Sequence, residues 1–213
     1  MDRKKIKESA KAKIKGNIWN ILWPLIVIGV IQSALSNLFG ATINIDLSNL
    51  DSVNVPTSAY MTSYGVSIIM AILYAGYLKY VLNFVRTGKF NTNSIIDTVK
   101  SKWLNILIAS ILSSFIASIC FLLFVIPGIV MSLAFTLVIY LVVETDIAGN
   151  DSLKKSRELM NGYKWDYFVF ILSFIGWFLL IPFTLGIILI WLVPYFRVAN
   201  AIYYDELYKK IKK

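Results

Sequence analysis

The sequence predicts an all-α membrane protein with six transmembrane helices arranged as three helical hairpins, and three observations lead to this fold class. First, 58% of the 213 residues are hydrophobic and the mean hydropathy is +0.69, whereas soluble domains are about 45–50% apolar. Second, the 21 Lys and Arg residues form four clusters, at 3–15, 79–102, 154–164 and 197–213. Third, the cation-free gaps between these clusters are apolar, and each is long enough for a hairpin that crosses the bilayer and returns.

The distribution of charge also predicts the orientation of the chain. Cytoplasmic loops of membrane proteins are enriched in Lys and Arg, so all four clusters and both termini are expected to be cytoplasmic. A net charge of +9 can also indicate nucleic-acid binding, but no nucleic-acid motif accompanies it. We therefore expect a single integral membrane domain, 1–213, whose cations contact anionic lipid headgroups and not nucleic acid.

The predicted spans, in chain order, are 17–39, 63–85, 103–125, 129–144, 165–182 and 187–204. The first is expected to be retained and not cleaved as a signal peptide, because its apolar run continues past Val30 without a small-residue cleavage site. Pro24 lies inside this span and is expected to kink it. Residues 40–62 contain two Asp and no cation, and they form the one sizeable external loop. Pro127-Gly128 predicts a tight external turn between the third and fourth spans.

Three amphipathic helices are predicted on the cytoplasmic side, at 2–15, 91–101 and 150–163. In the first, Ile6, Ala10 and Ile14 recur at i, i+4 and i+8 among Lys residues, which is typical of a helix lying on a membrane surface. We expect this segment to bind anionic headgroups of the inner leaflet. In the third, Asp151 is the expected N-cap and Gly162 the expected stop.

Four stretches of sequence together resemble DUF family 975, small six-span integral membrane proteins of mostly Gram-positive bacteria. They are SLKKSRELMNGYKWDYFVFILSFIGWFLL (152–180), TLGIILIWLVPYFRVANAIYYDEL (184–207), AKAKIKGNIWNILW (10–23) and VIPGIV (125–130). The resemblance covers most of the chain apart from the loop at 40–62. It implies a multi-pass protein of the bacterial cytoplasmic membrane, and it brings no catalytic residues with it.

The residue types present argue against catalysis. The chain contains no His and a single Cys, so His-based acid–base chemistry, a His metal site and an intramolecular disulfide are excluded. No nucleophile elbow, phosphate loop or dinucleotide fingerprint occurs. We therefore expect no enzymatic activity and no cofactor. The acidic residues on the cytoplasmic side are expected to cap helices and pair with nearby cations; they are Asp97, Glu144, Asp146, Asp151, Glu158, Asp166, Asp205 and Glu206.

Two cations fall inside predicted spans and form a candidate intramembrane charge cluster with one acid. Lys79 and Arg197 lie in the inner halves of the second and sixth spans, where an ionisable side chain marks a functional site unless it snorkels to the interface. Glu144 lies at a similar depth. We predict that it pairs with Arg197, which requires the fourth and sixth spans to be neighbours.

A stripe of small polar residues marks the third span. Ser110, Ser114 and Ser118 recur at i, i+4 and i+8. Such a stripe can line a permeation path or can let two helices pack closely. Close packing is the interpretation we favour from sequence.

The sequence is compatible with three classes of function. The first is a non-enzymatic membrane protein that associates with lipid or with a membrane protein partner, as an accessory, immunity or envelope-homeostasis factor. The second is a small transporter or permease-like subunit, since Pro and Gly breaks in spans can form substrate sites. The third is a membrane-embedded lipid enzyme, which the missing His and nucleophile motifs argue against. The sequence favours the first class.

Overall fold

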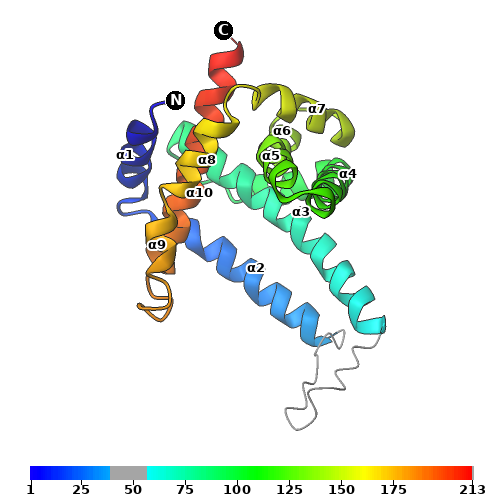
Figure 1. Cartoon of the computed structure of the whole chain (residues 1–213). Helices are drawn as coiled ribbons and strands as arrows, with labels where there is room; N and C mark the ends of the chain where they lie inside the picture. The colour runs from blue at the N-terminus through cyan, green and yellow to red at the C-terminus, as the bar shows by residue number, and fades with distance from the viewer. Residues whose placement is uncertain (39–56, 213) are drawn as a thin grey trace.

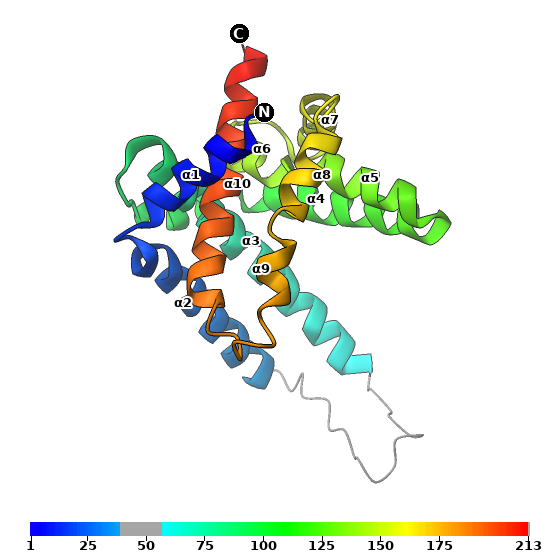
Figure 2. The same ribbon diagram turned by 60° about the vertical axis from the view of Figure 1, so that its left-hand side comes forward.

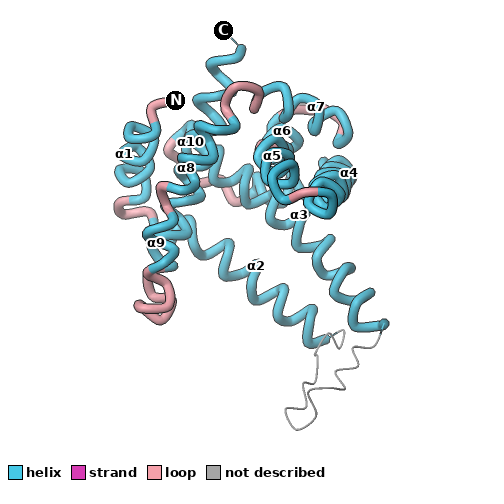
Figure 3. Tube along the Cα trace, viewed as in Figure 1, coloured by secondary structure: helices cyan, strands magenta, loops and turns pink. Residues whose placement is uncertain are grey.

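The fold is built from α-helices packed side by side, as the composition predicts. The computed structural model describes residues 1–38 and 57–212, and within these ranges it contains helices, turns and loops but no strand (Figure 3). The predicted all-α class is therefore confirmed. The predicted loop at 40–62 is shorter than expected, because α3 already begins at Thr57. The rest of that loop lies outside the described residues.

Four helical stretches in the described ranges are long and apolar enough to cross a membrane. They are α2 (Ile18–Leu38), the Ser63–Thr87 part of α3 (Thr57–Thr87), α4 (Asn93–Leu123), and α5 with α6 taken together (Val125–Phe135 and Val138–Glu144). They coincide with the first four predicted spans. Their apolar side chains face outward to a large extent, which a soluble protein of this size would avoid.

Two details of the third and fourth predicted spans differ from expectation. The short helix predicted at 91–101 and the span at 103–125 form one continuous helix, α4. The turn that follows is centred on Phe124, whose backbone is extended (φ −158°, ψ 143°), and not on Pro127-Gly128. Pro127 instead lies in the first turn of α5, where a missing N–H costs nothing. Gly128 is required there because a Cβ at this position would overlap the ring of Phe121.

The fifth predicted span is not one helix. It divides into α8 (Lys164–Leu172) and α9 (Ile175–Leu179), and a series of turns then leads into α10 (Leu189–Lys212). Aromatic side chains hold the broken segment against α10: the rings of Phe174 and Tyr195 lie 5.1 Å apart, and those of Trp177 and Trp191 lie 5.2 Å apart. Figure 2 shows α8 and α9 running beside α10, while α4 and α5 extend together away from it.

The N-terminal helix is present, but it faces the protein. Helix α1 (Arg3–Ile14) begins at Asp2, whose side chain accepts a hydrogen bond from the backbone N–H of Lys5. Ile6, Ala10 and Ile14, which the sequence placed on the membrane surface, are at most 2% exposed and pack into the main core against α10. The apolar stripe of α1 is therefore a docking face for α10. Its exposed side chains include Lys4, Lys5 and Lys11.

The amphipathic helix after α6 also packs firmly. Helix α7 (Gly149–Leu159) begins after Ala148, so the predicted N-cap, Asp151, lies in its first turn instead. The predicted stop is confirmed: Gly162 follows the helix with φ +78°, a conformation open to glycine. At its start, a Cβ on Gly149 would lie 2.5 Å from the carbonyl oxygen of Asn105. The missing side chain thus lets α7 rest directly on the backbone of α4.

A tyrosine hydroxyl ties α2 to α3 at the proline inside α2. Pro24 has no N–H, so the carbonyl of Asn20, four residues earlier, receives no helical hydrogen bond from it. The hydroxyl of Tyr80 on α3 donates to that carbonyl at 2.7 Å. The tertiary contact thus satisfies the acceptor that the sequence leaves open.

Candidate functional site

Three helices meet at a network of charged side chains centred on Arg86, near the end of α3. Its guanidinium reaches Glu144, the last residue of α6, with Nη1 2.8 Å from Oε1, and Asp205 of α10, with Nε 2.6 Å from Oδ1. The other carboxylate oxygen of Glu144 accepts a hydrogen bond from the Tyr204 hydroxyl, and that of Asp205 lies 2.6 Å from Nζ of Lys209. The Glu144 and Asp205 side chains are only 14% and 10% exposed, so both acids depend on these partners.

This network overturns the predicted pairing of Glu144 with Arg197. Glu144 pairs with Arg86, and among the described residues no salt bridge joins Arg197 to any acid. The Arg197 guanidinium instead lies over the ring of Tyr74, 4.9 Å from its centroid, in a cation–π contact. The sequence pointed to the right acid but missed Arg86, because Arg86 lies one residue past the predicted span boundary and was treated as a loop cation.

Lys79, the third member of the predicted cluster, lies within electrostatic range of Glu144 and Arg86 but is not ion-paired with Glu144. It is half-buried on α3, seven residues before Arg86, and within the described ranges it forms no salt bridge. A second ion pair lies closer to the start of α4. There Nζ of Lys102 contacts Asp146 at 3.0 Å and the carbonyl of Thr145 at 2.8 Å. The expectation that the acids named from the sequence pair with cations is therefore confirmed for Glu144, Asp146, Asp166 and Asp205.

The serine stripe lines a groove and does not serve close packing along its whole length. Ser110, Ser114 and Ser118 lie, together with Tyr64 and Ser67 of α3, along a groove of about 620 Å³ between α3 and α4. Ser114 and Ser118 are exposed. No charged residue is among those that line the groove.

Lys7 connects α1 to the break between α8 and α9. Its ammonium donates to the carbonyl of Ser173 at 3.1 Å and lies 4.7 Å from the centroid of the Phe174 ring. A cation at the end of α8 complements the free carbonyls and the helix dipole there. Burial, and secondarily the charge of Lys11, lowers the pKa of Lys7 below its ordinary value.

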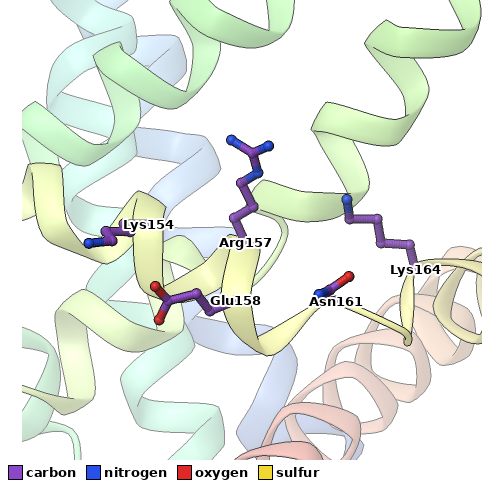
Figure 4. Close-up of a pocket in the computed structure, with 5 residues that line it drawn as sticks. All are labelled: Lys154, Arg157, Glu158, Asn161 and Lys164. Atoms are coloured by element: carbon purple, nitrogen blue, oxygen red, sulfur yellow. The ribbon is translucent and has the colours of Figure 1, made fainter.

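A concave and charged surface lies between α7 and α8. A pocket of about 380 Å³ is lined by Lys154, Arg157, Glu158, Asn161 and Lys164 (Figure 4). In that view the Lys164 side chain extends from the start of α8 back toward the Arg157 side of α7. Among the described residues none of the three cations forms a salt bridge, so their charge is available to a ligand. We call this surface the basic pocket.

The opposite face of α7 fixes the basic pocket in place. Leu153, Ser156 and Leu159 are buried, at spacings that put them on one side of the helix. The Ser156 hydroxyl donates to the carbonyl of Ala134 in α5 at 2.7 Å, which ties α7 to the end of that helix. Lys154 and Arg157 consequently point outward from a rigid support. In the sequence this site corresponds to the cation cluster at 154–164. The cluster alone did not predict a specific role.

The described residues offer no metal site, since no group of three or more Cys, Asp or Glu side chains lies close enough together in them to hold an ion. Cys120 is a free, half-buried thiol in α4.

Comparison with known proteins locates the similarity in the C-terminal part of the chain. No curated protein and no solved structure matches this chain. Residues 114–211, which contain α5 to α10, the basic pocket and Arg197, match the family described as "Protein of unknown function (DUF975)". The resemblance to DUF975 predicted from the sequence motifs is thereby confirmed over residues 114–211, whereas the resemblance of residues 10–23 stays a prediction.

Proposed function

We propose that this chain is a six-span, non-enzymatic protein of the bacterial cytoplasmic membrane that acts by associating with lipid or with a membrane protein partner. The observation that carries the proposal is the separation of charge from apolar surface. Arg86 and Lys102, from one cation cluster of the sequence, and Lys209, from another, pair with three acids, Glu144, Asp146 and Asp205. Leu122, in the last turn of α4, and Leu185, in the turns before α10, are 86% and 91% exposed.

The course of the chain supports an even number of crossings. The two termini lie at the same end of the molecule in Figure 1, as a cytoplasmic location of both requires. In this proposal α2 with α3, α4 with α5 and α6, and α8 and α9 with α10 supply the three hairpins. The third hairpin crosses the bilayer at 165–182 and 187–204 in spite of its breaks, because irregular backbone at membrane depth is tolerated where protein covers it.

The cations of α1 complete the proposed cytoplasmic face. Lys4, Lys11 and Lys15 are exposed while the apolar stripe of this helix is buried. Contact with the inner leaflet would therefore be electrostatic, through the basic side of α1, and would not require its apolar residues to enter the lipid.

The alternative, a small transporter or permease-like subunit, draws its support from the serine-lined groove between α3 and α4. A transport path for a charged substrate would be expected to combine that stripe with Arg197 or Glu144. Neither residue lines the groove, and Glu144 is already paired with Arg86. The geometry thus supports lipid or partner association over transport.

Membrane extraction followed by mass spectrometry tests the proposal. Membranes containing the protein are washed with high salt and then with alkaline carbonate, and we expect the protein to stay in the pellet. Purification in a mild detergent should then retain a stoichiometric lipid or membrane protein, above the level found with an unrelated membrane protein purified in parallel. Release of the protein by carbonate would contradict the membrane assignment, and a preparation that retains neither lipid nor protein would contradict the association.

A further inference from the structure

Two apolar grooves run along opposite sides of α5. The first lies between α5 and α8, measures about 290 Å³, and is lined on the α5 side by Ile126, Ile129, Val130 and Leu133. These positions share one face of the helix because they follow the i, i+3, i+4, i+7 spacing. The second lies between α4 and α5, measures about 340 Å³, and takes Met131 and Phe135 from the opposite face of α5.

Both grooves share lining residues with the basic pocket. Lys164 lines the first groove as well as the pocket. Lys154 and Arg157 line the second groove as well as the pocket. The basic pocket therefore adjoins two apolar grooves, one on each side of α5.

This arrangement selects a ligand with one anionic head and two apolar chains. Arg and Lys bind phosphate through charge-assisted hydrogen bonds, and Arg does so with two parallel donors. The three cations outweigh the single acid of the pocket, Glu158, and Asn161 adds an amide. A soluble phosphate compound would leave both grooves empty, and a neutral lipid would leave the cations without a counter-charge. Trp165, which lines the first groove beside Lys164, is suited to the interfacial depth at which headgroups lie.

We propose that α5 and α7 form a binding site for an anionic diacyl phospholipid, with its phosphate in the basic pocket and its two acyl chains in the grooves on either side of α5. This inference rests on the proposed function, since it names the lipid class that a lipid-associated membrane protein would hold. The Ser156–Ala134 hydrogen bond holds α7, which carries Lys154 and Arg157, against the end of α5.

Native mass spectrometry of the full-length protein in detergent tests the site. The added probes are phosphatidylglycerol, phosphatidylcholine with the same chains, single-chain lysophosphatidylglycerol, and glycerol 3-phosphate. We expect one tightly retained phosphatidylglycerol. Phosphatidylcholine keeps the phosphate but adds a choline cation that the three pocket cations repel, so it should bind roughly tenfold more weakly. The single-chain lipid, which leaves one groove empty, should bind at least about tenfold more weakly, and glycerol 3-phosphate weaker still.

Matched variants separate the pocket from general charge. Replacing Lys154, Arg157 and Lys164 together by Gln should weaken phosphatidylglycerol binding by roughly tenfold or more. Replacing Lys89, Lys100 and Lys155 by Gln removes the same charge from exposed positions outside the pocket and should leave binding unchanged. Val130→Trp, which fills the first groove, should weaken binding of the diacyl lipid, while Val27→Trp on the exposed face of α2 should not.

Equal binding of phosphatidylglycerol and phosphatidylcholine, or equal loss in the two triple variants, would overturn the site. Binding of glycerol 3-phosphate as tight as that of the lipid would overturn the role of the grooves. Each variant is also tested for carbonate-resistant membrane association. A triple variant that remains in the membrane yet binds as the unmodified protein does refutes the lipid site alone, whereas loss of the unmodified protein from the membrane refutes the proposed function.

Discussion

Nη1 of Arg86 lies 2.8 Å from Oε1 of Glu144, and this contact joins the end of α3 to the end of α6. The same guanidinium holds Asp205 of α10, so one side chain links three helices that lie far apart in the sequence. Because both acids are nearly buried, the arginine is the group that makes their negative charge tolerable.

The first prediction concerns this pair. Arg86→Met should lower the stability of the detergent-solubilised protein by about 1.5–3 kcal/mol, because it leaves buried Glu144 without its charged donor and leaves Asp205 with Lys209 alone. Glu144→Gln should cost less, since the amide still accepts from Tyr204. The double variant should be less destabilised than the sum of the two single variants by about 0.5–3 kcal/mol. Thermal unfolding measures all three, with Lys89→Met as an exposed control. Additive effects would mean that the two residues do not interact.

The second prediction concerns the hydrogen bond that Tyr80 donates to Asn20. Tyr80→Phe should cost about 1 kcal/mol, because the carbonyl of Asn20 then has no donor. In a Pro24→Ala background the cost should fall, since the introduced alanine provides the N–H that a helix normally supplies to that carbonyl. Unfolding midpoints of the four proteins in the cycle check this. A cost for Tyr80→Phe that is the same in both backgrounds would show that the proline does not create the need for the hydroxyl.

The third prediction compares two glycines. Gly149→Ala should destabilise the protein by about 1–3 kcal/mol, because the added Cβ would lie 2.5 Å from the Asn105 carbonyl and α7 would have to move off α4. Gly176→Ala, in α9, adds a methyl group where nothing lies within 4 Å. It should be neutral or stabilising by up to about 1 kcal/mol. A Gly149→Ala protein as stable as Gly176→Ala would contradict the close contact between α4 and α7.

Sequence patterns predicted the elements well where one strong signal dominated. The first four spans are long apolar runs joined in pairs by connections without Lys or Arg, and the structure has a helical stretch at each of them. The end of α7 before Gly162 was predictable from local sequence, because the backbone there has a positive φ, which glycine adopts readily. The pattern of Ile6, Ala10 and Ile14 also predicted α1 correctly, although it did not specify what the apolar face contacts. A membrane surface and a neighbouring helix select the same spacing of apolar residues, so periodicity cannot distinguish them.

Tertiary contacts determine the ion-pair partners, the position of the turn after α4 and the shape of the basic pocket, which the sequence patterns did not predict. Arg197 and Arg86 are both cations near the ends of spans, and only the packing of α10 against α3 determines which of them reaches Glu144. The turn after α4 was placed at Pro127-Gly128 because these residues commonly break helices. Pro127 is equally compatible with the first turn of a helix, and Gly128 serves the close approach to Phe121. The basic pocket lies where α7 and α8 come together, and the cation cluster alone gave no geometry for it.

The central claim is that the chain crosses the membrane six times with both termini in the cytoplasm. Thiol labelling in intact cells tests this topology directly. In a Cys120→Ser background, single cysteines are placed at Ser58, at Lys155 on the exposed face of α7, and in a short Gly-Ser insertion after Thr184, between α9 and α10. An impermeant thiol reagent should label the cysteine at 58 and the one inserted after 184, and should label position 155 only in inside-out vesicles. Labelling of 155 in intact cells would reverse the orientation. Labelling of the insertion after 184 only in inside-out vesicles would show that α8, α9 and α10 do not cross the membrane, and would contradict the six-span account.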